Sequence, residues 1–160
     1  MRSSLAALLL SLVICLGAGW IGSVLTRPAI PVWYAGLEKP AWTPASWIIS
    51  TVWRTVFALM GVALWMAWRE AARAPAAARR ALIAFFIQLA LNIAWSAVFF
   101  ARRNPGGALV TVAALWIAIA VTIVFFWRLR PAAGALLLPY IAWVSFAAAL
   151  NAAVWRLNDR

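Results

Sequence analysis

Residues 107–127 read GALVTVAALWIAIAVTIVFFW, an apolar run without a charged residue. Arg102 and Arg103 precede this run and Arg128 ends it. As a helix, it would be roughly 32 Å long at about 1.5 Å per residue, which matches a bilayer hydrocarbon core of about 30 Å. Because every backbone amide in lipid needs a partner within the protein, we expect a transmembrane helix here.

Four further runs of the same kind surround this one, so the predicted fold is all-α. It is a polytopic membrane protein with a bundle of five transmembrane helices in one domain, 1–160. The first run resembles a cleavable signal peptide or, at Cys15, a lipoprotein site; its continuation through Trp20 to Leu25 favours a retained helix. The predicted helices cover approximately 5–26, 47–68, 81–101, 107–127 and 134–155.

The composition argues against soluble and nucleic-acid-binding classes. Apolar residues make up 68% of the chain, against about 45–50% in soluble domains. The net charge is +11, but the basic residues lie mostly between the apolar runs, where they anchor helices at headgroup level. We therefore expect a lipid bilayer as partner and no nucleic acid. The alanine- and arginine-rich composition favours a bacterial membrane, without indicating which one.

The sequence contains few residues that could support acid–base or metal catalysis. There is no histidine, only three carboxylates occur, and Cys15 is the only cysteine. A metal site, a histidine-ligated haem and a carboxylate-pair hydrolase are accordingly not expected. We predict no metal, no cofactor and no conventional acid–base site.

The basic residues do not choose an orientation. Seven lie on one predicted side of the bundle and six on the other, a difference too small for the positive-inside rule. Arg54 lies about two turns inside the second run. A charge at that depth is a functional candidate, although snorkelling to the headgroups is the favoured interpretation.

The connection 27–46 differs from the others in length and composition. It contains four prolines together with Trp33, Tyr34 and Trp42. Long loops in compact domains are commonly functional lids or disordered, and disorder needs a polar, aromatic-poor sequence. We therefore predict a long ordered first loop that forms a lid over one end of the bundle.

Several runs carry polar or aromatic groups at membrane depth. Gln88, Asn92 and Trp95 share one helical face, and Trp143, Ala147 and Asn151 form a similar stripe. Facing one another and Trp53 across the bundle, these stripes would form an aromatic pocket with a few amides, a usual composition for a small-molecule site. Plain helix–helix packing and hydrogen bonding remain an alternative for both stripes, and Pro139 could bend the last helix and open space near Tyr140.

Five stretches of the sequence together resemble one known family. The loop reads WYAGLEKPAWTPASW over 33–47 and is followed by VWRTVFALMG over 52–61; the third run contains QLALNIAW over 88–95, and the last contains PYIAW over 139–143 and then LN at 150–151. Their order and spacing resemble the translocator protein family, also called tryptophan-rich sensory proteins or peripheral benzodiazepine receptors. The resemblance covers nearly the whole chain.

The resemblance implies a five-helix homodimer whose pocket is closed by the first loop. Family members bind porphyrins such as protoporphyrin IX and other haem-pathway tetrapyrroles, isoquinoline and benzodiazepine drugs and, in animals, cholesterol. The implied ligand-binding residues are Tyr34, Pro40, Trp42, Trp53, Asn92, Trp95, Trp143 and Ala147. The expected function is a membrane receptor or carrier for such ligands, with Lys39 or an arginine meeting the porphyrin carboxylates.

Two other functions stay open at the level of the sequence. Some bacterial relatives are reported to degrade protoporphyrin in light, which makes Trp143 a candidate for photo-oxidation. A regulatory stress sensor that acts through partner proteins is the other alternative. Cholesterol binding is not expected, because Ala152 and Ala153 stand where the animal motif carries a tyrosine.

Overall fold

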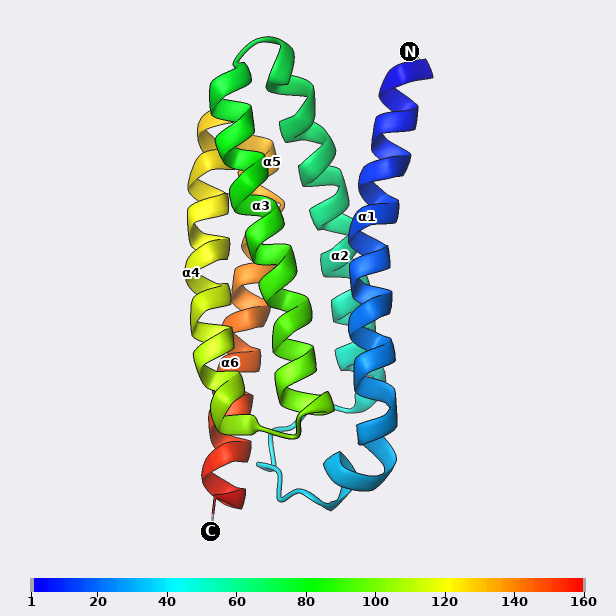
Figure 1. Cartoon of the computed structure of the whole chain (residues 1–160), viewed down its shortest axis with the longest axis vertical. Coiled ribbons are helices and arrows are strands. Elements are labelled where there is room, and N and C mark those ends of the chain that lie inside the picture. Colours follow the sequence, from blue (N-terminus) through cyan, green and yellow to red (C-terminus); the bar gives the residue numbers. More distant parts are fainter. Residues whose placement is uncertain (1, 160) are drawn as a thin grey trace.

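The computed structural model describes residues 2–159, and within them the chain is helical throughout apart from short connections. Five helical stretches there are long and apolar enough to cross a membrane. They run up and down side by side, so the two ends of the chain lie at opposite ends of the bundle (Figure 1). The long α-helices are α1 (Arg2–Thr26), α2 (Ser46–Arg69), α3 (Pro75–Ser96), α4 (Pro105–Leu129) and α6 (Leu138–Asn158).

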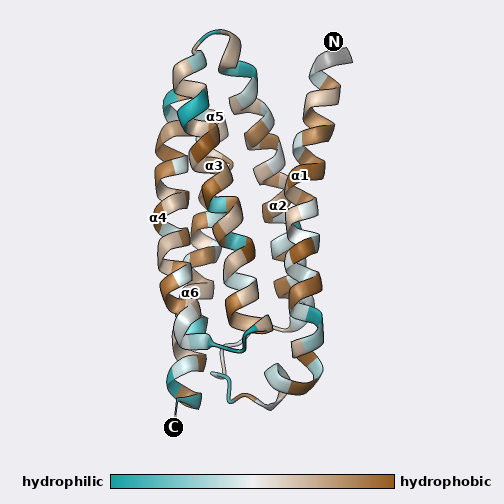
Figure 2. Cartoon of the chain, in the orientation of Figure 1, coloured by the Kyte–Doolittle hydropathy of each residue, from teal (hydrophilic) through white to brown (hydrophobic). Residues whose placement is uncertain are grey.

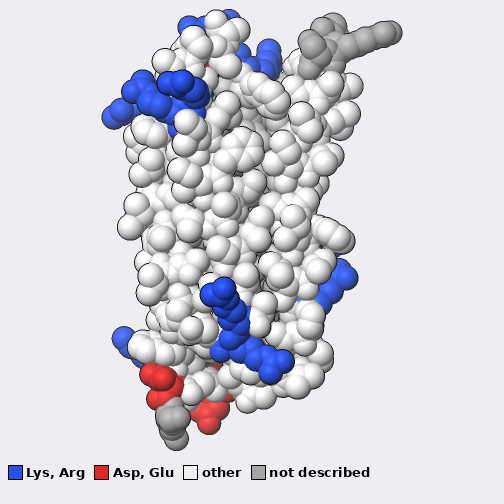
Figure 3. Space-filling view, in the orientation of Figure 1, with Lys and Arg blue, Asp and Glu red and all other residues white. Residues whose placement is uncertain are grey.

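The surface confirms an integral multi-pass membrane protein. Large apolar side chains point outward, including Val110 on α4, which is 74% exposed, and Val13 on α1, which is 66% exposed. Apolar residues cover the length of the helices (Figure 2). On the visible face, lysine and arginine gather towards the two ends and leave a wide uncharged band between them (Figure 3). That pattern suits contact with lipid tails.

The prediction that residues 27–46 form one long loop is partly wrong. The chain stays helical after α1 through a 3₁₀ turn, η1 (Arg27–Ala29), and a π-helical turn, η2 (Ile30–Tyr34). Pro28 and Pro31 do not break these turns because each lies in a first turn, where its missing N–H costs no hydrogen bond. The irregular lid is therefore limited to residues 37–45.

The third and fifth predicted helices also differ in their limits. α3 begins at Pro75, earlier than the predicted 81, and ends in a π-helical turn, η4 (Ala97–Ala101). The last helix begins as a short α5 (Pro131–Ala135), breaks at residues 136–137 and resumes as α6. Pro139 lies in the first turn of α6, so its missing donor falls at the break and not inside a continuous helix.

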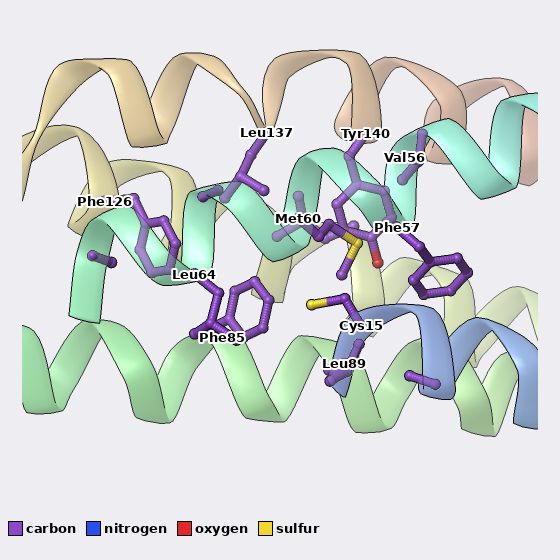
Figure 4. Close-up of a cluster of buried hydrophobic side chains, with 14 of the residues drawn as sticks. Cys15, Val56, Phe57, Met60, Leu64, Phe85, Leu89, Phe126, Leu137 and Tyr140 are labelled. Carbon is purple, nitrogen blue, oxygen red and sulfur yellow. The ribbon is translucent and has the colours of Figure 1, made fainter. Parts of the chain in front are cut away.

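The larger packed core lies between the helices away from the lid, and a smaller cluster of Phe99, Ala108 and Val154 packs at the lid end. Cys15, Met60 and Phe85 are 0% exposed, and Tyr140 is 1% exposed. Figure 4 shows these side chains meeting between the helices. Phe85 on α3 stacks on Phe126 of α4, with centroids 5.6 Å apart and planes 11° apart. On α2, the core residues follow later in the helix than Trp53, which leaves the half of α2 nearer the lid free to border a cavity.

Candidate functional site

A cavity of about 280 Å³ lies between α1, α2, α3 and α6 at the lid end of the bundle. η2 and η4 also contribute to its wall. The lining residues are Gly19, Gly22, Ser23, Thr26, Arg27, Ile30, Tyr34, Ser46, Ile49, Ser50, Trp53, Phe57, Asn92, Trp95, Ser96, Phe99, Phe100, Trp143, Phe146, Ala147, Leu150, Asn151 and Val154.

Three indoles from three different helices form one wall of the cavity. The ring of Trp53 on α2 lies 6.0 Å from that of Trp95 on α3 and 6.3 Å from that of Trp143 on α6, measured between centroids. The Trp53 and Trp143 planes are nearly perpendicular, at 83°. Such edge-to-face contacts are favourable for aromatic pairs. The result is a rigid aromatic wall formed by residues far apart in the sequence.

Buried amides fix the deep end of this wall. Asn92 Nδ2 donates to the Tyr140 hydroxyl at 2.9 Å, and that hydroxyl donates to Gln88 Oε1 at 2.9 Å. The network joins α3 to α6 within the membrane, where an unpaired amide would be costly. Gln88 is fully buried and lies behind the wall, whereas Asn92 reaches the cavity. Of the polar residues predicted on one face of α3, Gln88 therefore serves packing and Asn92 lines the cavity.

Trp95 is oriented by a second network. Its Nε1 donates to Asn151 Oδ1 at 3.1 Å, and Asn151 Nδ2 donates to the carbonyl of Pro105 at 2.8 Å. Asn151 thereby ties α3, α4 and α6 together beside the cavity. With its indole N–H already paired, Trp95 offers a ligand its ring and not its donor.

Trp143 has the opposite character. Its Nε1 is buried and has no hydrogen-bond partner within residues 2–159. The ring stacks on Phe146, with centroids 5.2 Å apart and planes 26° apart. A buried unpaired donor is unfavourable by about 1–3 kcal/mol. Trp143 contributes to the cavity wall, while its indole N–H is enclosed within the protein.

The lid end of the cavity is bordered by η2, through Ile30 and Tyr34, and residues 37–45 of the lid lie outside the lining. Trp33 and Tyr34 pack edge-on against Phe99 of η4, at 5.7 and 6.3 Å between centroids. Lys39 Nζ donates to the carbonyls of Tyr34 at 2.8 Å and Leu37 at 2.7 Å. These bonds cap carbonyls at the end of a helical segment, where the Tyr34 carbonyl also accepts from the Leu37 N–H at 3.3 Å. Lys39 therefore ties the first residue of the lid to η2.

Six of the eight predicted ligand-binding residues line the cavity: Tyr34, Trp53, Asn92, Trp95, Trp143 and Ala147. Pro40 and Trp42 do not. The carbonyl of Pro40 accepts from the Thr43 N–H and hydroxyl, which forms a turn in the lid. Trp42 is half exposed and reaches the cavity only through Phe146, at 5.7 Å between centroids. Both residues belong to the lid, residues 37–45, none of which lines the cavity.

The sequence interpretation missed the contribution of α1. Gly19, Gly22, Ser23 and Thr26 line the cavity from this helix. Their spacing of three, four and seven residues puts them on one helical face, but a face of small residues does not by itself distinguish a cavity wall from close helix packing. Arg54, the charge predicted inside the second run, is exposed and absent from the lining, and its Nε donates to the carbonyl of Ser50 at 3.1 Å.

The fold and the cavity define a multi-pass α-helical membrane protein with an aromatic cavity inside the bundle. The TspO/MBR family model matches residues 11–156. The tryptophan-rich protein TspO of Archaeoglobus fulgidus is 40% identical over 151 residues, covering 94% of this chain and 96% of the relative. The chain belongs to the TspO/MBR family.

Relatives from other organisms agree with this assignment. The translocator protein of Homo sapiens is 41% identical over 126 residues, covering 79% of this chain and 75% of the relative. The tryptophan-rich sensory protein of Cereibacter sphaeroides is 34% identical over 152 residues, covering 95% and 92%. These names indicate a membrane protein of the receptor or sensor type.

Proposed function

We propose that this chain is a membrane receptor or carrier for porphyrins and for related flat hydrophobic molecules such as isoquinoline and benzodiazepine drugs. The observation that carries the proposal is the wall formed by Trp53, Trp95 and Trp143 beside a cavity within the membrane-spanning bundle. Flat π-systems stack on indole faces. Family membership adds support, because the resemblance implies ligands of this class.

The size of the cavity bears on how ligands would enter. Its volume of about 280 Å³ is close to the lower limit of about 300 Å³ for small-molecule sites. A drug of isoquinoline size would need little rearrangement. A porphyrin macrocycle is larger than this cavity, so the segments that line it from α1, η2, α2, α3, η4 and α6 would have to move apart.

A titration with matched tryptophan variants tests this function. Protoporphyrin IX, or an isoquinoline drug, is added to the purified protein, and binding is followed by quenching of tryptophan fluorescence. Trp53→Phe should weaken binding about threefold to tenfold, since an aromatic contact is worth about 0.5–1.5 kcal/mol beyond its area. Trp47→Phe is the control: Trp47 is on the same helix but is 70% exposed and outside the lining. Absence of saturable binding, or equal losses in both variants, would reject the proposal.

A second candidate is light- and oxygen-dependent degradation of the bound porphyrin. The observation in its favour is Trp143, an oxidisable indole in the cavity wall whose N–H has no partner within residues 2–159. An illuminated porphyrin transfers its energy to O₂, and the activated oxygen attacks the macrocycle or the nearest indole. Here O₂ is the oxidant, and the protein contributes position without an acid–base pair.

A further inference from the structure

The cavity has a polar side that the indoles do not share. Ser23, Thr26 and Arg27 line it from α1 and η1, and Ser46 and Ser50 line it from α2. The hydroxyls of Thr26 and Ser50 donate to carbonyls one turn earlier in the chain, at 2.8 and 2.9 Å. Ser23 and Ser46 make no such bond within residues 2–159, so their donors are available. The cavity is therefore amphipathic.

Arg27 differs from the neighbouring cations in being both on the cavity and unengaged. Lys39 Nζ is occupied by backbone carbonyls and does not line the cavity. Arg54 is outside the lining. Within residues 2–159, the Arg27 guanidinium makes no hydrogen bond or ion pair. Among the described residues, Arg27 is the cationic residue that lines the cavity and has unpaired hydrogen-bond donors.

The position of Arg27 along the chain also suits an anionic group. It directly follows the apolar run 5–26 and begins η1, where the helix enters the lid region. This places it near headgroup level, at the end of the membrane span. An ionised carboxylate is costly to bury in hydrocarbon. A ligand with a flat apolar body and a carboxylate edge would therefore place its body against the indoles and its edge near Arg27.

We propose that Arg27 is the carboxylate-recognition residue of this cavity and that it selects acidic ligands over their neutral analogues. The inference rests on the proposed function and names the ligand chemistry that it favours. Arginine suits this role because its planar guanidinium pairs with a carboxylate through two parallel N–H···O bonds. Ser23 supplies a further donor on the same side. Of the two cations that the sequence analysis left open, Lys39 or an arginine, this proposal takes the arginine.

The test compares protoporphyrin IX with its dimethyl ester, which has the same ring and no free carboxylate. Affinities are measured by fluorescence quenching for the unaltered protein and for Arg27→Gln, Arg27→Lys and Arg102→Gln. Arg102→Gln is the matched control, because it removes the same charge at the same end of the molecule but outside the lining. Arg27→Gln should weaken binding of the free acid about tenfold or more, as expected for a hydrogen bond to a charged group. Binding of the ester should not change.

Each outcome decides the inference. Loss of the acid–ester difference in Arg27→Gln, its partial retention in Arg27→Lys and its full retention in Arg102→Gln support a role in carboxylate recognition. Equal weakening of acid and ester in Arg27→Gln would show a structural role and overturn the inference. So would unchanged acid binding. Ester binding by the unaltered protein tests the aromatic cavity separately; if neither compound binds, the proposed function and this inference both fail.

Discussion

The side chain of Asn158, at the end of α6, holds the backbone of Glu38 in the lid by two hydrogen bonds. The Glu38 N–H donates to Asn158 Oδ1 at 3.0 Å, and Asn158 Nδ2 donates to the Glu38 carbonyl at 2.9 Å. The amide thus pairs with the lid as a neighbouring β-strand would. Nδ2 also donates to the Val154 carbonyl at 2.8 Å, which orients the side chain. The lid is fastened to the helix that carries Trp143 and Ala147.

Replacing Asn158 should loosen the lid. In Asn158→Ala, both bonds to Glu38 are lost, and amide hydrogen exchange at Glu38 should accelerate about fivefold for each kcal/mol of protection removed. Asn104→Ala is the control: Asn104 caps α4 through the Gly107 N–H at the same end of the bundle. Hydrogen exchange followed by mass spectrometry measures both variants. Unchanged exchange in the lid would mean that Lys39 and the aromatic contacts hold it alone.

Tyr140, which is buried, should contribute more to stability than Tyr34, which lines the cavity. Tyr140→Phe leaves the Asn92 amide without its acceptor and Gln88 Oε1 without its donor. We expect a loss of about 1–2 kcal/mol in the free energy of unfolding. The control is Tyr34→Phe, because the Tyr34 hydroxyl makes no hydrogen bond within residues 2–159. Circular dichroism of unfolding in detergent measures the stability of both variants. An equal loss of unfolding free energy in Tyr140→Phe and Tyr34→Phe would contradict the role of the network.

Gly61 should be required for the close approach of α1 and α2. A Cβ at this position would lie 2.9 Å from Leu12 Cδ2 and 3.0 Å from Leu12 Cα. Because the backbone of α1 cannot yield as a side-chain tip can, Gly61→Ala should be destabilising by about 1–3 kcal/mol. At Gly17 an added Cβ meets nothing within 4 Å. Gly17→Ala should therefore retain stability, since alanine favours helix more than glycine does; the two apparent unfolding temperatures make the comparison.

Trp143 should control bleaching if the protein degrades porphyrin in light. Trp143→Phe keeps an aromatic ring against Phe146 but removes the oxidisable indole. The rate of protein-dependent bleaching of bound protoporphyrin under illumination should fall severalfold. Absorbance is recorded with and without oxygen, and Trp47→Phe serves as control. An unchanged rate in Trp143→Phe would remove this indole from the reaction.

The polar stripes were predictable because amides in a membrane helix must face other helices. Asn92 and Trp95 line the cavity as the shared face of α3 predicts, and Trp143 and Ala147 do so from α6. The helical turn at 30–34 was not predictable from its prolines alone, since their meaning depends on whether they begin a turn or interrupt one. Likewise, the turn at Pro40 directs Trp42 towards Phe146 and away from the cavity.

The sequence by itself determined five spans, their approximate limits and the membrane as solvent, because each depends on local hydrophobicity and on backbone hydrogen bonds within the segment. Tertiary structure alone decided which face of α1 borders the cavity. Both faces of that helix are apolar, and lipid tails are as apolar as a protein interior, so hydropathy does not distinguish them. Close contacts such as Gly61 against Leu12 select the face, and with it they place Ser23 and Arg27 beside the cavity.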